Sequence, residues 1–244
     1  FWRSAEAVHT MAAAKKIAYA LRDTFFGDPD FVTVPMDDML SKEQAAKWGQ
    51  WRRSGCPLPA SNPLDMGDTT YFTVADRFGN VISCVQSLYR FFGSGIEVGD
   101  SGIFLHNRGA YFSLDPASPN VIAPRKRPVH TLTAGMVSCE GQPRISLGTM
   151  GGDGQPQTQL QMLVRLLLLG TDVQSAVDGP RWLHGSMEKT ASDQLLLETG
   201  FDSNWEKILE TYGHKPRWAG RWSQDMGHAH ALVYDPVHTL WNAA

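Results

Sequence analysis

The stretch PLDMGDTTYFTVADRFGNVISCVQSLYRFFGSG, residues 63–95, runs from a loop of turn-forming residues directly into a pattern typical of a β-hairpin. TYFTVAD and NVISCVQSL are rich in β-branched and aromatic residues and flank RFG, which predicts two antiparallel strands joined by a tight turn. Thr69 and Thr70 stand where the loop meets the first strand. This abrupt junction has two interpretations: a plain loop boundary, or a cleavage point that makes Thr69 a new N-terminus.

The second interpretation has a specific chemistry. A threonine hydroxyl inside a chain is a weak nucleophile because the residue carries no base of its own. An N-terminal threonine has an α-amine, with a pKa of roughly 7.7–8.0, that can take the hydroxyl proton. Cleavage between Asp68 and Thr69 would therefore create a nucleophile and its base in one residue. From spacing alone, the plain loop boundary is the commoner explanation.

A second candidate is GTMGGDGQPQTQLQML, residues 148–163, where a strand pattern leads into adjacent glycines and then a helix. Gly151 and Gly152 can turn their backbone N–H groups outward, which near a helix start suits an anion or a developing oxyanion. No Gly-Lys-Ser/Thr follows, so this is not a nucleotide-binding loop. A tight strand-to-helix turn is the alternative. The glycine-rich segment 90–113 could wall a pocket or lie on the surface.

Outward from the hairpin, helix and strand patterns follow one another. Residues 54–68 lack periodicity and read as an exposed connector. Ser41 is a plausible helix N-cap. The order of elements indicates antiparallel sheet material covered by helices, an α+β layered fold. Helices are expected over 5–23, 37–53, 156–170 and 202–213, with a short helix within 172–182 that Gly179 and Pro180 stop. A second hairpin is expected over 129–137 and 143–149, and strands over 193–198 and 227–236, the last of the chain.

The composition, 42% hydrophobic and 19% charged over 244 residues, is typical of a globular chain with a sizeable core. A net charge of −3 gives no electrostatic reason to expect nucleic acid or an anionic membrane as a partner. The longest apolar run, 163–169, contains Arg165 and is too short to span a bilayer. The chain opens on Phe1 without a methionine, so we expect a fragment of a longer protein at both ends, and any export signal would lie in the missing part.

The cysteines and histidines form no pattern typical of a metal site. Cys56, Cys84 and Cys139 are odd in number and fit no zinc or redox spacing. Cys84 and Cys139 lie in apolar runs and are expected to be buried thiols, which favours the cytoplasm over an oxidising compartment. His228 and His230 share one strand face without an evident third ligand. We therefore expect neither a metal nor an organic cofactor.

Taken together, these segments resemble the γ-glutamyltranspeptidase family of N-terminal-nucleophile (Ntn) hydrolases over nearly the whole chain. The motifs stand in the family's order: GDPDFVTVP (27–35), TTYFTVADRFGNVIS (69–83), FGSGIEVGDSGIFLHN (92–107), RKRPVHTLTAGMV (125–137), GTMGGDGQPQTQLQ (148–161) and MGHAHALVYD (226–235). The resemblance implies a four-layer αββα sandwich and a precursor that cleaves itself between Asp68 and Thr69. Residues 1–68 would then be the C-terminal part of the large (α) subunit with a linker, and 69–244 the small (β) subunit catalytic region, truncated at its C-terminus.

The same resemblance assigns the reacting groups. Thr69 would be the nucleophile and its freed amine the base, with Thr70 following it in the substrate site. Ser87 stands where the family has a threonine that supports the nucleophile. Gly151 and Gly152 match the family's oxyanion-hole glycines. The implied reaction is acyl transfer from an amide to Thr69, then to water or an amine. After cleavage, the two pieces would form an αβ heterodimer that binds a small acyl-amide substrate.

The departures from the family bear on specificity. Glutathione-cleaving members have asparagine at Tyr89, a glutamine and an acidic residue at Arg108 and Tyr111, and two serines at His130 and Thr131. Tyr111 cannot supply a negative charge for an α-ammonium group, whereas Arg108 offers a forked donor suited to carboxylates. The pocket is therefore expected to prefer a carboxylated acyl group without an amine, such as glutaryl or oxamyl, as in the cephalosporin-acylase-like and oxamate-amidohydrolase-like branches.

Three alternatives stay open at this point. One is ordinary γ-glutamyl transfer from glutathione. Another is plain packing at each of the substituted positions. The third is an uncleaved, inactive homologue that acts as a binding or structural protein.

Overall fold

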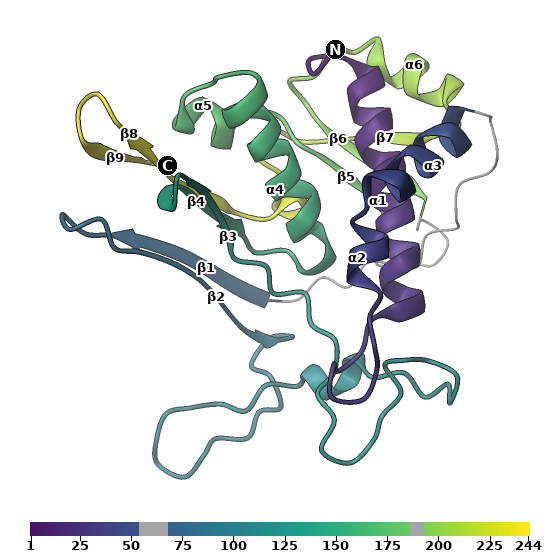
Figure 1. Ribbon diagram of the computed structural model, residues 1–244, viewed down its shortest axis with the longest axis vertical. Coiled ribbons are helices and arrows are strands. Elements are labelled where there is room, and N and C mark those ends of the chain that lie inside the picture. The colour runs from purple at the N-terminus through teal and green to yellow at the C-terminus, as the bar shows by residue number, and fades with distance from the viewer. Residues whose placement is uncertain (54–67, 186–192) are drawn as a thin grey trace.

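The hairpin that the sequence predicts forms one layer of the fold (Figure 1). The computed structural model describes residues 1–53, 68–185 and 193–244. Strand β1 (Asp68–Ala75) pairs antiparallel with β2 (Val81–Tyr89), and Thr69 lies opposite Ser87. Because side chains alternate along a strand, Thr69 shares one face of β1 with Tyr71 and Thr73.

That face packs against a four-stranded sheet of order β3-β4-β8-β9, built from β3 (Gly135–Cys139), β4 (Gln142–Thr149), β8 (Ala229–Asp235) and β9 (Leu240–Ala243). The hydroxyls of Tyr71 and Thr73 lie 3.1 and 2.7 Å from Ser146 Oγ on β4. A Cβ atom at Gly148 would come within 2.3 Å of the Tyr71 ring. Glycine at 148 therefore lets the two sheets approach closely.

Helices α4 (Gln155–Leu163) and α5 (Val173–Asp178) cover the other face of this sheet (Figure 1). The β1–β2 hairpin lies on the opposite face of this sheet. On the outer side of the hairpin, Phe72, Val74 and Ile82 are 44%, 53% and 58% exposed. Within the described residues the layers are thus helix, sheet, sheet, and the outer hairpin face has no helical cover. The core between α4, α5 and the four-stranded sheet consists of Ile145, Leu147, Met162, Val173, Ala229 and Ala231.

A third sheet, of order β5-β6-β7, joins β5 (Trp182–His184), β6 (Gln194–Glu198) and β7 (Lys215–Ala219). It packs with α1 (Ala5–Phe25) and α6 (Trp205–Thr211) around a core that includes Val8, Met11, Trp182, Leu195, Leu197 and Leu209. Gln157 and Gln161 on α4 bond the main chain of β5, at 2.9 Å to the His184 N–H and 3.0 Å to the Trp182 N–H. Side-chain amides one helical turn apart therefore take the place of a further strand beside β5.

The N-terminal helices match their predicted places. The predicted helix over 5–23 is α1, and residues 37–53 form α2 (Met36–Met39) and α3 (Lys42–Arg53). Ser41 Oγ accepts a hydrogen bond from the Gln44 N–H at 3.0 Å, which confirms the predicted N-cap. No helix in the described ranges is long and apolar enough to cross a membrane.

Several predicted boundaries were wrong. The strand expected over 129–137 begins only at Gly135, and its turn is Glu140–Gly141, both with positive φ (53° and 76°). Strands β5, β7 and β9 were not predicted. Because β9 follows β8, 227–236 is not the last strand, and β6 pairs with β7 in parallel rather than antiparallel. The helix expected to continue to 170 changes to a π-helical turn at Val164–Leu168. Cys139 is exposed and Cys84 only half-buried, while Cys56 and most of the 54–68 connector lie outside the described residues.

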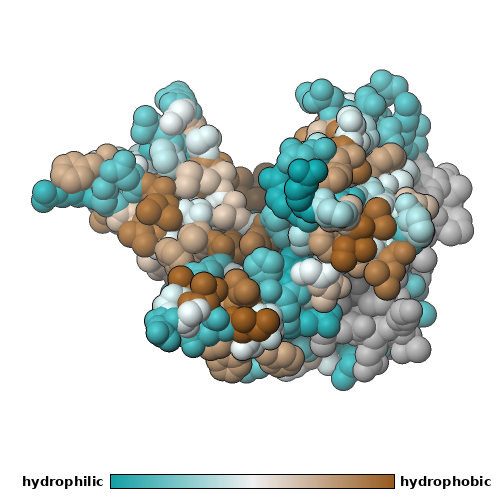
Figure 2. Space-filling view, turned by 90° about the horizontal axis from the view of Figure 1, so that it is seen from below, coloured by the Kyte–Doolittle hydropathy of each residue, from teal (hydrophilic) through white to brown (hydrophobic). Residues whose placement is uncertain are grey.

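The segment between β2 and β3, residues 90–134, is a long excursion that holds the 3₁₀ turn η1 (Arg108–Tyr111) and isolated bridges. Seen from the side of these loops, apolar side chains gather at the surface, which is hollowed between two lobes (Figure 2). Phe91, Phe92 and Ile103 are 82%, 75% and 62% exposed. This segment therefore contributes surface rather than core, apart from the few residues that turn inward at η1.

Candidate active site

Thr69 lies at the start of β1, where the strand pairing has an irregularity between Asp68 and Thr69. Its hydroxyl donates to Ser87 Oγ at 3.0 Å, and Ser87 Oγ also accepts the Tyr89 N–H at 2.9 Å. Both hydroxyl groups can rotate, so either can donate to the other. Ser87 thus contacts the Thr69 oxygen from the neighbouring strand, and its supporting role stays a prediction.

A surface cavity of about 380 Å³ opens at this point. Thr69 and Ser87 line it together with Thr70, whose side chain is exposed. Met150, the residue before the glycine pair, lines the same cavity. The end of β4 therefore reaches the cavity that holds the predicted nucleophile.

The glycine pair follows β4 at once. Gly151 and Gly152 have φ values of 121° and 52°, a backbone conformation that residues with a Cβ rarely adopt. Gly152–Gly154 then form a 3₁₀ turn that leads into α4. A Cβ at Gly227, just before β8, would lie 2.1 Å from the Met150 carbonyl oxygen, so two backbones pass here in direct contact. Glycine is therefore favoured by backbone conformation at 151 and 152, and by the close approach of two backbones at 227.

The predicted substrate-binding residues gather around Tyr89. This side chain is 1% exposed, and its φ of 79° is unusual for an aromatic residue. The Arg108 guanidinium lies 4.1 Å from the centre of the Tyr89 ring, and the Tyr111 ring meets it edge-on at 5.9 Å. Arg108 Nη1 donates to Thr131 Oγ1 at 3.3 Å. Strain beside a reacting residue is a common feature of functional sites.

His130 lies at the edge of this group. Its side chain is exposed, yet partial desolvation and then the nearby Arg108 charge lower its pKa below the ordinary value. The imidazole is therefore neutral at neutral pH, and its Nδ1 accepts the Leu132 N–H at 3.2 Å. The structure thus brings Tyr89, Arg108, Tyr111 and Thr131 into contact and leaves His130 near Arg108.

One residue that the sequence analysis missed is Asp153, the only non-glycine residue of the 3₁₀ turn. It is 2% exposed and bonds Arg22 of α1. The signal available in the sequence was an acidic residue directly after the glycine pair. Its partner could not be read from the sequence because it lies 131 residues away.

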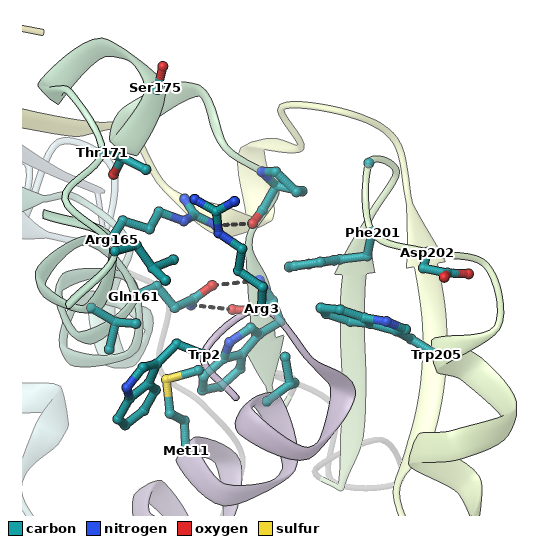
Figure 3. A pocket seen from close by; sticks show the side chains of 16 residues that line it. Trp2, Arg3, Met11, Gln161, Arg165, Thr171, Ser175, Phe201, Asp202 and Trp205 are labelled. Carbon is teal, nitrogen blue, oxygen red and sulfur yellow. Dashed lines mark hydrogen bonds between the residues drawn. The ribbon is translucent and has the colours of Figure 1, made fainter.

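A separate apolar cavity of about 340 Å³ lies between the start of α1, the end of α4 and α6, with Trp2, Phe201 and Trp205 among its walls (Figure 3). None of the predicted site residues lines it. Arg165 reaches its edge and donates to backbone carbonyl groups, including that of Pro180. Among the residues that the structure describes, no group of three or more His, Cys, Asp or Glu side chains could hold a metal ion.

The gamma-glutamyltranspeptidase family model matches residues 2–244. The chain belongs to this family. It is 38% identical over 241 residues to a glutathione hydrolase-like proenzyme (YwrD) of Bacillus subtilis, covering 99% of this chain and 46% of the relative. It is 37% identical over 239 residues to the oxamate amidohydrolase proenzyme of Klebsiella pneumoniae, covering 98% and 45%. The chain therefore spans less than half the length of these γ-glutamyltranspeptidase relatives.

The fold agrees with this membership. The structure superimposes on a cephalosporin acylase from Bacillus halodurans with a TM-score of 0.85 and 30% identity, covering 100% of this chain and 44% of that one. The α+β Ntn-hydrolase sandwich expected from the resemblance is confirmed. The division of the chain at residue 68 and the roles of the individual γ-glutamyltranspeptidase positions stay predictions.

Proposed function

We propose that this chain is the catalytic part of a self-cleaving threonine amidohydrolase or acyltransferase. The observation that carries the proposal is the Thr69 hydroxyl, bonded to Ser87 in the wall of a cavity that is also lined by Met150, the residue before the glycine pair. Cleavage of the Asp68–Thr69 bond would free the amine that this hydroxyl needs as its base. The relatives carry enzyme names, and none favours the alternative of an inactive binding protein.

The proposed reaction transfers the acyl group first to Thr69 and then to water or an amine. The Thr69 hydroxyl oxygen attacks the substrate amide carbonyl while its proton passes to the Thr69 amine. The negative charge on the carbonyl oxygen is held by N–H groups of the Gly151–Gly152 turn. Collapse of this intermediate breaks the C–N bond, and the protonated Thr69 amine gives its proton to the leaving amine. Water, or an acceptor amine, then attacks the acyl ester and restores the Thr69 hydroxyl.

For the acyl group, we propose a carboxylate without an α-amine. Arg108 supplies a cation beside the Tyr89 ring and Thr131, and neutral His130 adds no competing charge. Tyr111 adds a hydroxyl where an acidic residue would be needed to pair with an α-ammonium group. A panel of γ-glutamyl, glutaryl and oxamyl amides tests this, and preference for γ-glutamyl amides over both others would contradict it.

The nucleophile is tested in the protein at its full natural length. Wild type should give a fragment that starts at Thr69, seen by intact-mass spectrometry, and should then hydrolyse a panel amide. Thr69→Ala should abolish both cleavage and turnover. Thr70→Ala is the matched control on the next residue and should keep the cleavage. Turnover by protein with a closed 68–69 bond, or by Thr69→Ala, would overturn the proposal.

A further inference from the structure

Helix α1 reaches the glycine turn through an ion pair of a buried carboxylate, Asp153, with a partly exposed guanidinium, Arg22, which also pairs with Asp23 on the same helix. Arg22 Nη1 lies 2.5 Å from Asp153 Oδ1, and the Asp153 side chain is 3% exposed. Tyr19, one helical turn before Arg22, donates its hydroxyl to the Asp153 carbonyl oxygen. The Arg22 guanidinium lies 4.3 Å over the Tyr19 ring, so both side chains form one face of α1 aimed at Asp153.

Two more groups hold Asp153 from other directions. The Tyr111 hydroxyl donates to Asp153 Oδ1 at 3.5 Å, and Gln157 Nε2 donates to its carbonyl oxygen at 3.4 Å. Asp153 is thereby bonded through both its side chain and its main chain. Its immediate neighbours, Gly152 and Gly154, have no side chain to anchor them. The position of the turn therefore depends on Asp153.

Because the Asp153 carboxylate is buried, removing the Arg22 cation is expected to disturb the position of Asp153. A buried carboxylate that loses its cation keeps its charge without compensation, which is far more disruptive than loss of an exposed pair. Lys15 of the same helix adds a further positive charge acting on this region, but it does not reach Asp153 and lies 3.5 Å from His184 instead. Arg22, by contrast, contacts the Asp153 carboxylate directly.

We infer that Arg22 and Asp153 are a positioning pair, which sets the N–H groups of Gly151 and Gly152 for the developing oxyanion. The inference rests on the proposed function, because only there does the turn bind a transition state. It places a residue from the segment before the expected cleavage point in control of the turn after it. Neither residue touches the substrate, and both act through the glycine backbone.

The positioning role predicts a split in the kinetic constants. An oxyanion hole interacts with the transition state rather than the bound substrate, so a displaced turn lowers kcat and leaves KM nearly unchanged. Losing one donor outright lowers kcat by about 10²–10³. Because Arg22 acts indirectly, we expect Arg22→Met to lower kcat by about 10–100-fold, with KM changed less than about threefold.

The experiment uses the protein at its full natural length. Arg22→Met is compared with Lys16→Met, which removes the 3.0 Å pair between Lys16 and Asp193 from the same helix but leaves the turn alone. Hydrogen exchange of the peptide that covers 149–156 reports the turn directly, whether or not the protein is an enzyme. We expect faster exchange in Arg22→Met only, and partial recovery of kcat and exchange protection in Arg22→Lys and with added guanidinium ion.

The outcomes separate the two proposals. Unchanged exchange and unchanged kcat in Arg22→Met would overturn the positioning pair even if wild type is an active amidase. If Lys16→Met loses as much kcat as Arg22→Met, and guanidinium ion does not restore kcat in Arg22→Met, then the Arg22–Asp153 pair only stabilises the fold and has no positioning role. Wild type that turns over no amide would overturn the proposed function, while exchange at 149–156 would still decide whether Arg22 holds the turn. If Arg22→Met does not fold, Asp153→Asn, which keeps the shape of the side chain, replaces it in the same comparison.

Discussion

Replacing Ser87 by alanine removes a single oxygen that serves two donors. Ser87 Oγ accepts the Thr69 hydroxyl at 3.0 Å and the Tyr89 N–H at 2.9 Å. A hydrogen bond contributes about 1 kcal/mol net to folding, so the free energy of unfolding should fall by about 2 kcal/mol. As the Thr69 proton passes to the Thr69 amine, the Ser87 hydroxyl can turn and donate to the Thr69 oxygen, which carries partial negative charge in the transition state. Such a bond is worth about 1.5–3 kcal/mol, so its loss should lower kcat by about 10–150-fold. Ser87→Ala is therefore expected to lower kcat by more than its loss of folding free energy alone would explain.

The assay compares Ser87→Ala with Ser87→Thr and Ser83→Ala at full natural length. Threonine keeps the hydroxyl and should retain most of the cleavage at 68–69 and of the amide turnover. Ser83 lies on the same strand and accepts or donates at 2.9 Å to the Tyr71 hydroxyl, away from the nucleophile. Ser83→Ala should therefore lose stability and keep kcat. Cleavage is followed by intact mass, turnover by release of the amine, and stability by urea unfolding.

If Ser87→Ala cleaves itself and turns over substrate as fast as Ser83→Ala, with the same loss of stability, then Ser87 is only a packing residue. Thr69 would in that case need another group to hold its hydroxyl.

Other expectations concern stability. Burial lowers the pKa of His184 to about 3 and that of His214 to about 4, so below about pH 6.5 the unfolded chain binds more protons than the folded chain. The free energy of unfolding, measured by urea titration, should therefore fall as the pH is lowered from 7 to 5. The fall is at most about 1.4 kcal/mol per pH unit for each histidine. Gly148→Ala would drive a methyl group to 2.3 Å from the Tyr71 ring and should cost about 1–3 kcal/mol in thermal unfolding. Arg165→Met leaves the carbonyl oxygens of Ala176, Gly179 and Pro180 without their donor and should cost more than about 2 kcal/mol in urea unfolding.

Each of these has a matched control. His214→Gln should flatten the pH dependence, and an equally steep slope in that variant would rule out His214 as a source. Gly220→Ala adds a methyl group where no atom lies within 4 Å and should be nearly neutral. Arg165→Lys keeps the charge but not the fork, so a stability equal to wild type would contradict the role of the separate carbonyl contacts.

The first hairpin was predictable because its pattern and its environment agree. Tyr71 is buried against β4 while Phe72 points outward, so successive side chains of β1 alternate between an inner and an outer face, as expected for a strand. The position of Ser87 opposite Thr69 follows from the pairing register once the turn is placed. Here local sequence and tertiary packing point to the same structure.

The missed strands have no such local signal. Strand β5 has three residues, all buried, and part of its main chain is satisfied by Gln157 and Gln161 of α4 rather than by another strand. Strand β7 has the sequence Lys-Pro-Arg-Trp-Ala, in which Pro216 and two cations argue against a strand. Proline is tolerated here because β7 is an edge strand that pairs only with β6 among the described residues. Both depend on distant elements, which a window of sequence does not contain.

The sequence could indicate those parts of the candidate site whose residues lie close together along the chain. Thr69 and the glycine pair have signatures within a few residues, whereas the pairing of Arg22 with Asp153 joins segments far apart in the sequence. Arg108 shows the limit of reasoning from residue type alone. The residue type indicates a carboxylate partner, as we propose for the substrate, but it does not indicate that the guanidinium also stacks on Tyr89 and donates to Thr131.

The expected cut at 68–69 would separate α1 from the strands that carry Thr69 and the glycine turn. Covalent connection is not what holds α1 there, because Ala7, Val8 and Met11 are buried in a core shared with Trp182 and Leu195. Tyr19 and Arg22 continue the same helix to Asp153. A helix held along its length by packing and at its end by an ion pair stays in place when the distant link is cut. The proposed cleavage would therefore create a new N-terminus at Thr69 without releasing the helix that we infer positions the turn.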